Sequence, residues 1–305
     1  MRSKAICLSL VFAFGAGLAL VSFARSQDPD QDDVRGAFLT TRPKTADKPA
    51  KTTSVAKRGR RRPKTGGTKP SDTGEKAPTS GNSDGVSTVK EGRTSRQRLG
   101  LGLTLFMRDS NGLAVRVDPT HEFHKGDRVR VLLETNTDGH LYIFNTTDGG
   151  APVMIYPDPQ LDEAGNFIQA HVPFEIPSSV AAEERLRWFS FDEQAGTERL
   201  YFVFTREPLA DVPIEDELVK FCSENKTQCA WHPAAALWAS LEKEMASPLK
   251  VDNSQNFGRA QSSTEHDAAT RGIGLAKNDP EPSMVIMSAS SGPGMLVTGL
   301  ELFHK

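Results

Sequence analysis

Short apolar runs separated by turn residues fill the C-terminal two thirds of the chain. In the stretch 127–135, apolar side chains fall on one face, at Val129, Val131 and Leu133, and the charged residues Arg128, Arg130 and Glu134 fall on the other. This alternation is typical of a strand with one buried face and one face in solvent. The dipeptide 138–139 is Asp-Gly, which supplies the positive φ that a tight hairpin turn requires. A β-hairpin is therefore expected here.

Other short apolar runs follow at regular spacing, separated by turn residues. We expect strands at 99–107, 113–117, 140–145, 152–156, 167–172, 186–191 and 199–205. In the last run both faces are apolar, which is typical of a central strand covered on both sides. Many short strands at such spacing predict an all-β fold, an immunoglobulin-like β-sandwich over residues 99–209. We expect one core built from Val129, Val131, Leu133, Leu141, Ile143, Phe189, Phe191, Leu200 and Phe202.

A small helical insertion is expected after the strands, within 210–247. The stretch 213–222 begins with Pro and carries three acidic residues in its first turn, and 233–245 has an apolar stripe at helical spacing. Together they predict a helical hairpin. Residues 248–282 are polar and are expected to be irregular. The last segment, 283–305, predicts a terminal β-hairpin that joins the sandwich.

The N-terminus has the features of a signal peptide over residues 1–26. Arg2 and Lys4 precede an uncharged apolar run, Ala5–Phe23, and small residues suited to cleavage follow it. We therefore expect export to the periplasm or the extracellular space. The apolar run is also just long enough to span a bilayer, so the protein is membrane-anchored if the signal is not cleaved.

A basic arm, residues 27–98, follows the signal and contains few large apolar residues. Its net charge is +8, whereas residues 99–305 carry −13. Such a segment buries too little apolar surface to offset chain entropy, so disorder is expected. Its basic cluster comprises Lys57, Arg58, Arg60, Arg61, Arg62 and Lys64.

The charge of this cluster suggests an anionic partner in the envelope, which is a protein, a polymer or a lipid surface. No aromatic residue interleaves the cluster, so stacking on bases is unsupported, and we expect no nucleic acid in the native compartment. Two other interpretations of the arm remain open: it is a solvated spacer, or it folds back on the acidic body.

The compartment decides how the cysteines are interpreted. Once the signal is removed, Cys222 and Cys229 remain, and in an oxidising compartment they most simply form one disulfide. Two free thiols are the alternative. Two ligands are too few for a metal site, and no His lies at zinc-finger spacing.

A series of motifs in the predicted sandwich carries a family resemblance. The motifs are Phe123-His124-Lys125-Gly126-Asp127-Arg128-Val129-Arg130, Asn136-Thr137-Asp138-Gly139-His140-Leu141-Tyr142-Ile143, Tyr156-Pro157, Ile176-Pro177, Phe189-Ser190-Phe191-Asp192, Gly196-Thr197-Glu198 and Thr205-Arg206-Glu207-Pro208. In this order they resemble the bacterial domain of unknown function (DUF) family 4384, over about residues 100–209 and the final strand at 300–305. His140 stands where the family usually has an aromatic residue, and Ala195 where Pro is common. The resemblance implies a sandwich-like module of envelope or signalling proteins, and no catalytic residues.

Few residues suggest chemistry, and we expect neither a metal nor another cofactor. The run 121–124, His-Glu-Phe-His, lacks the spacing of zinc hydrolase motifs. The acidic loop 158–166 lacks the ligand pattern of an EF-hand, and whether it binds a cation stays open. No nucleophile elbow, phosphate-binding loop or dinucleotide fingerprint is present, and no motif identifies a small-molecule substrate.

These observations favour a non-catalytic exported envelope module for binding or scaffolding, tethered by the basic arm, and not an enzyme. The alternative is a secreted hydrolase whose site is assembled from scattered residues, such as His171 and Asp192.

Overall fold

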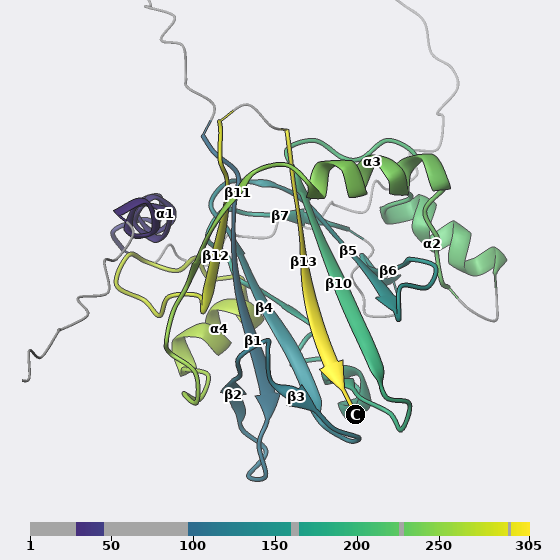
Figure 1. Ribbon diagram of the computed structural model, residues 1–305, viewed down its shortest axis with the longest axis horizontal. Coiled ribbons are helices and arrows are strands. Elements are labelled where there is room, and N and C mark those ends of the chain that lie inside the picture. Colours follow the sequence, from purple (N-terminus) through teal and green to yellow (C-terminus); the bar gives the residue numbers. More distant parts are fainter. Residues whose placement is uncertain (1–28, 46–96, 160–164, 226–228, 292–293) are drawn as a thin grey trace, which may run out of the picture.

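Two β-sheets packed face to face form the body of the protein (Figure 1). The computed structural model describes residues 29–45, 97–159, 165–225, 229–291 and 294–305. The signal segment and the basic cluster therefore lie outside the described residues. The fold is mostly β with few helices, which confirms the all-β class and its two-sheet architecture.

The first sheet, sheet A, is antiparallel and contains a path of five strands with two further strands attached to it. The path runs through β11 (Leu249–Asn253), β12 (Met284–Ser288), β1 (Gly100–Arg108), β4 (Arg128–Thr135) and β8 (Phe174–Ile176). The attached strands are β2 (Ala114–Arg116) on β1 and β9 (Phe189–Ser190) on β4.

The second sheet, sheet B, has β10 at its centre, paired on both sides with long antiparallel strands. Its path runs through β3 (Glu122–Phe123), β13 (Met295–His304), β10 (Gly196–Thr205), β5 (Gly139–Thr147) and β6 (Val153–Tyr156), and β7 (Phe167–Ile168) is attached to β5. Only the short β3–β13 pair is parallel among the strand pairs of the described segments.

The core between the sheets confirms the period-two prediction. Eight of the nine expected side chains are buried in it, and Phe189 packs against it partly buried. The central strand β10 is covered on both faces, as expected: Leu200 and Phe202 face the other sheet, and Tyr201 and Val203 face outward.

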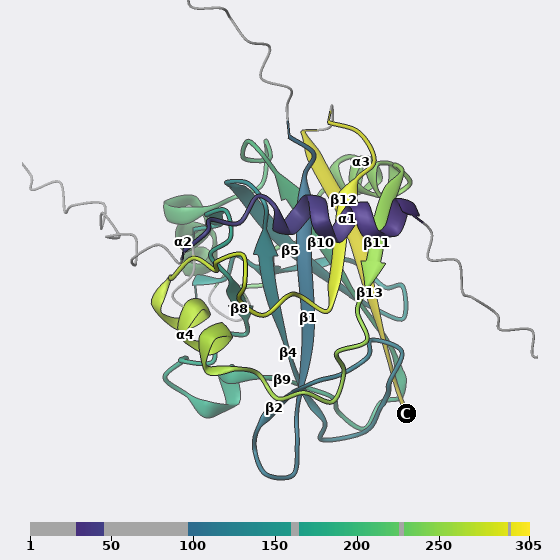
Figure 2. The ribbon, with the colours of Figure 1, turned by 90° about the vertical axis from the view of Figure 1, so that its left-hand side faces the viewer.

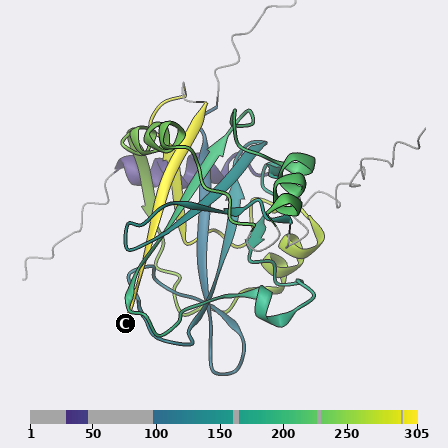
Figure 3. The same ribbon diagram turned by 90° about the vertical axis from the view of Figure 1, so that its right-hand side faces the viewer.

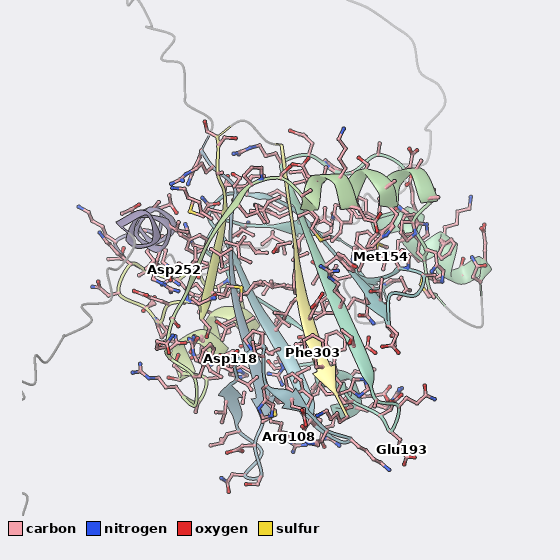
Figure 4. The ribbon with its side chains drawn as sticks, viewed as in Figure 1. Arg108, Asp118, Met154, Glu193, Asp252 and Phe303 are labelled. Carbon is pink, nitrogen blue, oxygen red and sulfur yellow. A yellow bond between two sulfur atoms is a disulfide. The ribbon has the colours of Figure 1, made fainter. Side chains whose placement is uncertain are left out.

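Helices cover the outward face of sheet B (Figure 3). The expected helical hairpin is present as α2 (Glu215–Glu224) and α3 (Ala235–Met245). Their apolar side chains form a second core with Tyr142, Phe144, Tyr201 and Val203. Met154 lies at this interface, beside α2 (Figure 4).

The outward face of sheet A is also covered, which corrects the expectation for part of the arm. Helix α1 (Pro29–Leu39) crosses β12 and β11 and packs Val34 and Phe38 on Val285 (Figure 2). Residues 29–45 are therefore ordered and not part of a disordered linker. Their few apolar residues suffice because a surface more than 200 residues away in the sequence accommodates them.

Burial of this face also corrects the prediction that one face of β4 lies in solvent. Arg130 and Glu134 are each 4 % exposed. Their charges are matched by the buried groups Arg42 and Glu175, so the alternating pattern survives although most of this face is covered.

The segment 248–282 is not irregular, because it contains β11 and helix α4 (Ser263–Arg271). Strand β11 is polar because it lies at the edge of sheet A. Helix α4 begins with a capping box in which Ser262 and Glu265 satisfy each other's backbone N–H groups, a signal that was present in the sequence.

The expected terminal hairpin is also wrong. The two runs do form strands, but β12 pairs with β1 and β11 in sheet A, whereas β13 pairs with β10 and β3 in sheet B. Strand β12 lies between β1 and β11 and β13 lies between β10 and β3, so the chain crosses from one sheet to the other at 289–294.

Candidate functional site

The inner face of sheet B changes from apolar to polar along its strands. On β5 the inward positions run from Leu141 and Ile143 to Asn145 and Thr147. On β10 they run from Phe202 and Leu200 to Glu198, and on β13 from Leu300 and Leu302 to His304. Because these strands are neighbours, the polar residues gather at one end of the sandwich.

A cavity of about 280 Å³ lies at this end. It is lined by Val129, Asn145, Thr147, Ile155, Phe189, Ser190, Phe191, Asp192, Glu198, Leu200, Leu302 and His304. Sheet A supplies Val129 and Phe189 as an apolar wall opposite the polar residues of sheet B. Figure 4 labels Phe303 and Glu193 near this end, and Figure 1 marks the C-terminus there.

Glu198 is fixed by two neighbours on β5. Asn145 Nδ2 and Thr147 Oγ1 each donate a hydrogen bond of 2.9 Å to Glu198 Oε2. A carboxylate only accepts, so the Asn145 amide must turn its nitrogen toward Glu198 and leave its oxygen, Oδ1, for another partner. Glu198 Oε1 has no partner among the described residues.

Two buried polar atoms at the cavity lack partners within the described part of the chain: Asn145 Oδ1 and His304 Nδ1. The His304 side chain belongs to a residue that is 5 % exposed, and its ring centroid lies 5.0 Å from that of Phe191. Leaving a buried polar group unpaired costs about 1–3 kcal/mol. Such unpaired groups at a cavity are typical of a site that something else completes.

The charged groups at the cavity are acidic. Asp192 is exposed at the rim, where its Oδ1 accepts the backbone N–H of Gln194. Glu198 lies deeper, and no Lys or Arg lines the cavity among the described residues. The cavity thus combines apolar walls, two carboxylates and two unsatisfied polar atoms.

A second polar cluster holds the N-terminal segment to sheet A. Arg42 Nε and Nη2 bind both oxygens of Glu134 at 2.8 and 2.6 Å. His171 Nδ1 lies 2.7 Å from Glu134 Oε1, and its Nε2 lies 2.8 Å from Thr41 Oγ1. Burial alone would raise the pKa of Glu134, but the hydrogen bonds from His171 and Arg42 outweigh it and lower that pKa.

Two more buried arginines are paired on the same side of the molecule. Arg116 binds Glu265 of α4, and Arg130 lies 3.5 Å from Glu175 with its guanidinium over the Trp188 ring. Burial lowers the pKa of both arginines. Both guanidinium groups are occupied by these ion pairs and ring contacts within the protein, so we assign them no ligand.

The structure does not bring together the residues suggested for a hydrolase. The backbone N–H of His171 donates to the Thr135 carbonyl. The backbone N–H of Phe191, next to Asp192, donates to the Asp127 carbonyl. His171 and Asp192 thus lie at opposite ends of β4, about 25 Å apart for a strand of this length. His171 is instead part of the Arg42–Glu134 cluster.

The cysteine pair lies where it was expected. Cys222 in α2 and Cys229 before α3 are linked, with Cα atoms 4.6 Å apart. The acidic loop 158–166 is described only in part; its Asn166 is buried, with Oδ1 3.1 Å from His140 Nδ1.

The run 121–124 lies at the C-terminal end of β13, where Glu122 Oε2 binds Lys305 Nζ at 2.7 Å. The hydrogen bond from Lys305 lowers the pKa of Glu122. Within the described ranges, no group of three or more His, Cys, Asp or Glu residues is placed to hold a metal ion. Nor does any described helix have the length and apolar character needed to cross a membrane.

The matched family segment covers much of this site. Residues 122–208 match the family model of the domain of unknown function DUF4384. The DUF4384 segment contains Asn145, Asp192 and Glu198, whereas β13 with His304 lies beyond it. Neither the curated proteins nor the solved structures gave a match to this chain.

Sequence reasoning missed Asn145, Glu198 and His304 as a group. Each occupies a position whose parity along its strand points inward, where an apolar residue is the norm. That break in alternation was a detectable signal on each strand, but pairing of the three strands was needed to place the residues together.

Proposed function

We propose that this protein is a non-catalytic binding module of the cell envelope that takes a ligand into the cavity at the end of its sandwich. The observation that carries the proposal is the pair of buried, unpartnered atoms, Asn145 Oδ1 and His304 Nδ1, at a cavity with largely apolar walls. Specific ligand sites combine apolar walls with a few placed polar groups.

The compartment and the tether are part of the same proposal. The basic and apolar start of the chain and the Cys222–Cys229 pair support export to the periplasm or beyond. The cluster at 57–64 supports contact with an anionic envelope surface or protein. The finer immunoglobulin-like assignment of the sandwich is likewise proposed, on the strength of its two packed, mainly antiparallel sheets.

A hydrolase is the rival function, and the cavity geometry favours it less. Acid–base or nucleophilic catalysis requires a base within hydrogen-bond reach of a nucleophile or an orienting group. His304 Nδ1 makes no hydrogen bond within the described residues, and Asp192 Oδ1 accepts from a backbone N–H. The polar groups are placed to receive a ligand and not to relay a proton.

The test compares the wild-type protein with a variant whose cavity mouth is blocked. Thr147 is exposed and lines the cavity from the inward face of β5, so Thr147→Trp should fill the mouth without overpacking the core. Ser223→Trp, at an exposed position on α2, is the matched control. In a fragment screen by protein-observed NMR, hits should shift Asn145 and His304 signals in the wild type and the control and not in Thr147→Trp.

Two outcomes would contradict this function. Hits that shift the same signals in all three proteins would mean that the cavity is not the site. Turnover of ester, peptide or glycoside probes that Thr147→Trp abolishes would establish the hydrolase instead.

A further inference from the structure

We infer that the cavity recognises a primary ammonium group carried on an apolar stem. This inference rests on the proposed binding function and names the chemical class of its ligand. Three atoms at the cavity are available as acceptors: Glu198 Oε1, Asn145 Oδ1 and His304 Nδ1. An ammonium group has three N–H donors and no acceptor, so it is the simplest single group that satisfies all three.

The hydrogen bonds at Glu198 determine that this site offers acceptor atoms, and not donors, to a ligand. Asn145 Nδ2 and Thr147 Oγ1 both donate to Oε2, so these neighbours hold the carboxylate and turn no donor toward the cavity. Asn145 is thereby committed to offering its oxygen. His304 accepts at Nδ1 when its proton is on Nε2. A ligand group that itself only accepts would leave all three atoms unsatisfied.

Charge favours a cation over a neutral donor. Glu198 and Asp192 are the formally charged residues of the lining, and no Lys or Arg lines it in the described part of the chain. An ammonium group near Glu198 would gain a charge-assisted hydrogen bond, which is about twice as strong as a neutral one. An anionic ligand would meet like charges.

The walls fit an apolar stem. Phe189, Phe191, Leu200 and Leu302 line the cavity. The Phe191 ring is stacked on Phe123, with 4.8 Å between ring centroids. The volume of about 280 Å³ lies just below the usual range of ligand cavities, roughly 300–1,000 Å³, so the ligand group must be small. A chain of several methylenes that ends in an amine, as in a lysine side chain or a short alkylamine, suits both size and polarity.

The experiment uses three probes of equal length on the full mature chain: n-hexylammonium, 1-hexanol and hexanoate. Binding is followed by protein-observed NMR at neutral pH and moderate salt. We expect hexylammonium to bind at least about ten times more tightly than hexanol, because one charge-assisted contact is worth about that factor. Hexanoate should not bind.

A charge-removing variant tests the role of Glu198. Glu198→Gln should lower hexylammonium affinity about tenfold and leave hexanol affinity unchanged. Glu301→Gln is the matched control, because Glu301 is exposed on the outer face of β13. If Glu198→Gln fails to fold, the selectivity of the wild type among the three probes still decides the question.

Each remaining outcome counts against the ligand class. Equal binding of hexylammonium and hexanol would overturn the inference and leave a binding cavity in place. Hexylammonium binding that Glu301→Gln weakens as much as Glu198→Gln would show non-specific attraction to an acidic surface. If no probe binds and the fragment screen also finds no ligand at the cavity, the proposed function itself fails.

Discussion

Position along a strand decides whether a side chain packs or is available for binding. Phe202 points between the sheets and is fully buried, whereas Phe303 on the adjacent strand points outward and is 49 % exposed. The same parity turns Glu198 and His304 inward at the end of the sheet, where the core gives way to the cavity. Packing residues and site residues therefore share one face and differ only in their distance from the sandwich end.

Truncation of Phe202 tests the core. Phe202→Ala should reduce the free energy of unfolding by about 3–5 kcal/mol, because it removes a fully buried ring and leaves a cavity. Phe303→Ala is the control and should change stability by about 0.5 kcal/mol or less, as surface substitutions usually do. Urea denaturation measures both. Equal losses would mean that the strand register is wrong.

At the scale of elements, the segment 29–45 is a short helix and a tail held by two arginines. Arg35 binds Asp252 of β11 at 2.7 Å, and Arg42 binds Glu134 of β4. Figure 4 labels Asp252 beside α1. An isolated helix of this length is marginal in water, so the contacts with sheet A must stabilise it.

These contacts predict a specific sensitivity to acid. The pKa of Glu134 is lowered on folding, below the value of about 4.3 for an unperturbed Glu. Its carboxylate therefore stabilises the folded state above about pH 4.3. This contribution is lost as the pH falls through the folded-state pKa.

Glu134→Gln should therefore make the free energy of unfolding less dependent on pH between about 5 and 3. Stability measured by urea denaturation across this range provides the readout, with Glu301→Gln as the exposed control. A variant curve parallel to that of the wild type would remove Glu134 from the acid response.

The α2–α3 hairpin yields a prediction about the disulfide. The pair closes a short loop, so Cys222→Ser with Cys229→Ser should cost about 2–3 kcal/mol of stability, a value that depends on the loop-entropy model. Alkylation of native protein without reductant should label neither cysteine, and reduction should expose two thiols. Two labels before reduction would mean free thiols and would weaken the argument for export.

At the scale of the whole molecule, the packed segment 29–45 means that the chain is attached to the sandwich on both sides of the basic cluster. Residues 29–45 pack on sheet A, and residue 97 leads into β1 of the same sheet (Figure 2). The cluster at 57–64 thus lies between two pieces of chain that are both fixed to the sandwich. Under the proposed function, two chain segments and not one would connect the bound anionic surface to the sandwich.

Replacing the six basic residues of the cluster by Gln should therefore weaken binding to anionic vesicles. Each basic residue near such a membrane contributes about 1 kcal/mol. The wild-type affinity should fall steeply with salt, because screening acts over about 8 Å at physiological ionic strength. The matched control replaces six other basic residues between 46 and 96: Lys48, Lys51, Lys69, Lys76, Lys90 and Arg93. Equal loss in both variants would make the total charge, and not the cluster, responsible.

The sequence by itself determined the features that depend on neighbouring residues. Alternation placed β1, β4, β5 and β10 and their shared core, and the acidic first turn and apolar stripe placed the helical hairpin. These predictions succeeded because strand parity and helix periodicity act over a few residues. The cysteine pair was also expected, because two cysteines left in an exported chain most simply form one disulfide.

Only the tertiary structure decided which distant segments meet. Helix α1 has too few apolar residues to fold alone, and it is ordered because β12 and Glu134 provide apolar and charged partners far along the chain. The strands β12 and β13 are close in sequence yet pair in different sheets, because each finds partners on both sides elsewhere in the chain, β12 between β1 and β11 and β13 between β10 and β3. Asn145, Glu198 and His304 gather in the same way: each faces inward near one end of its own strand, and the pairing of β5, β10 and β13 brings these ends to one cavity.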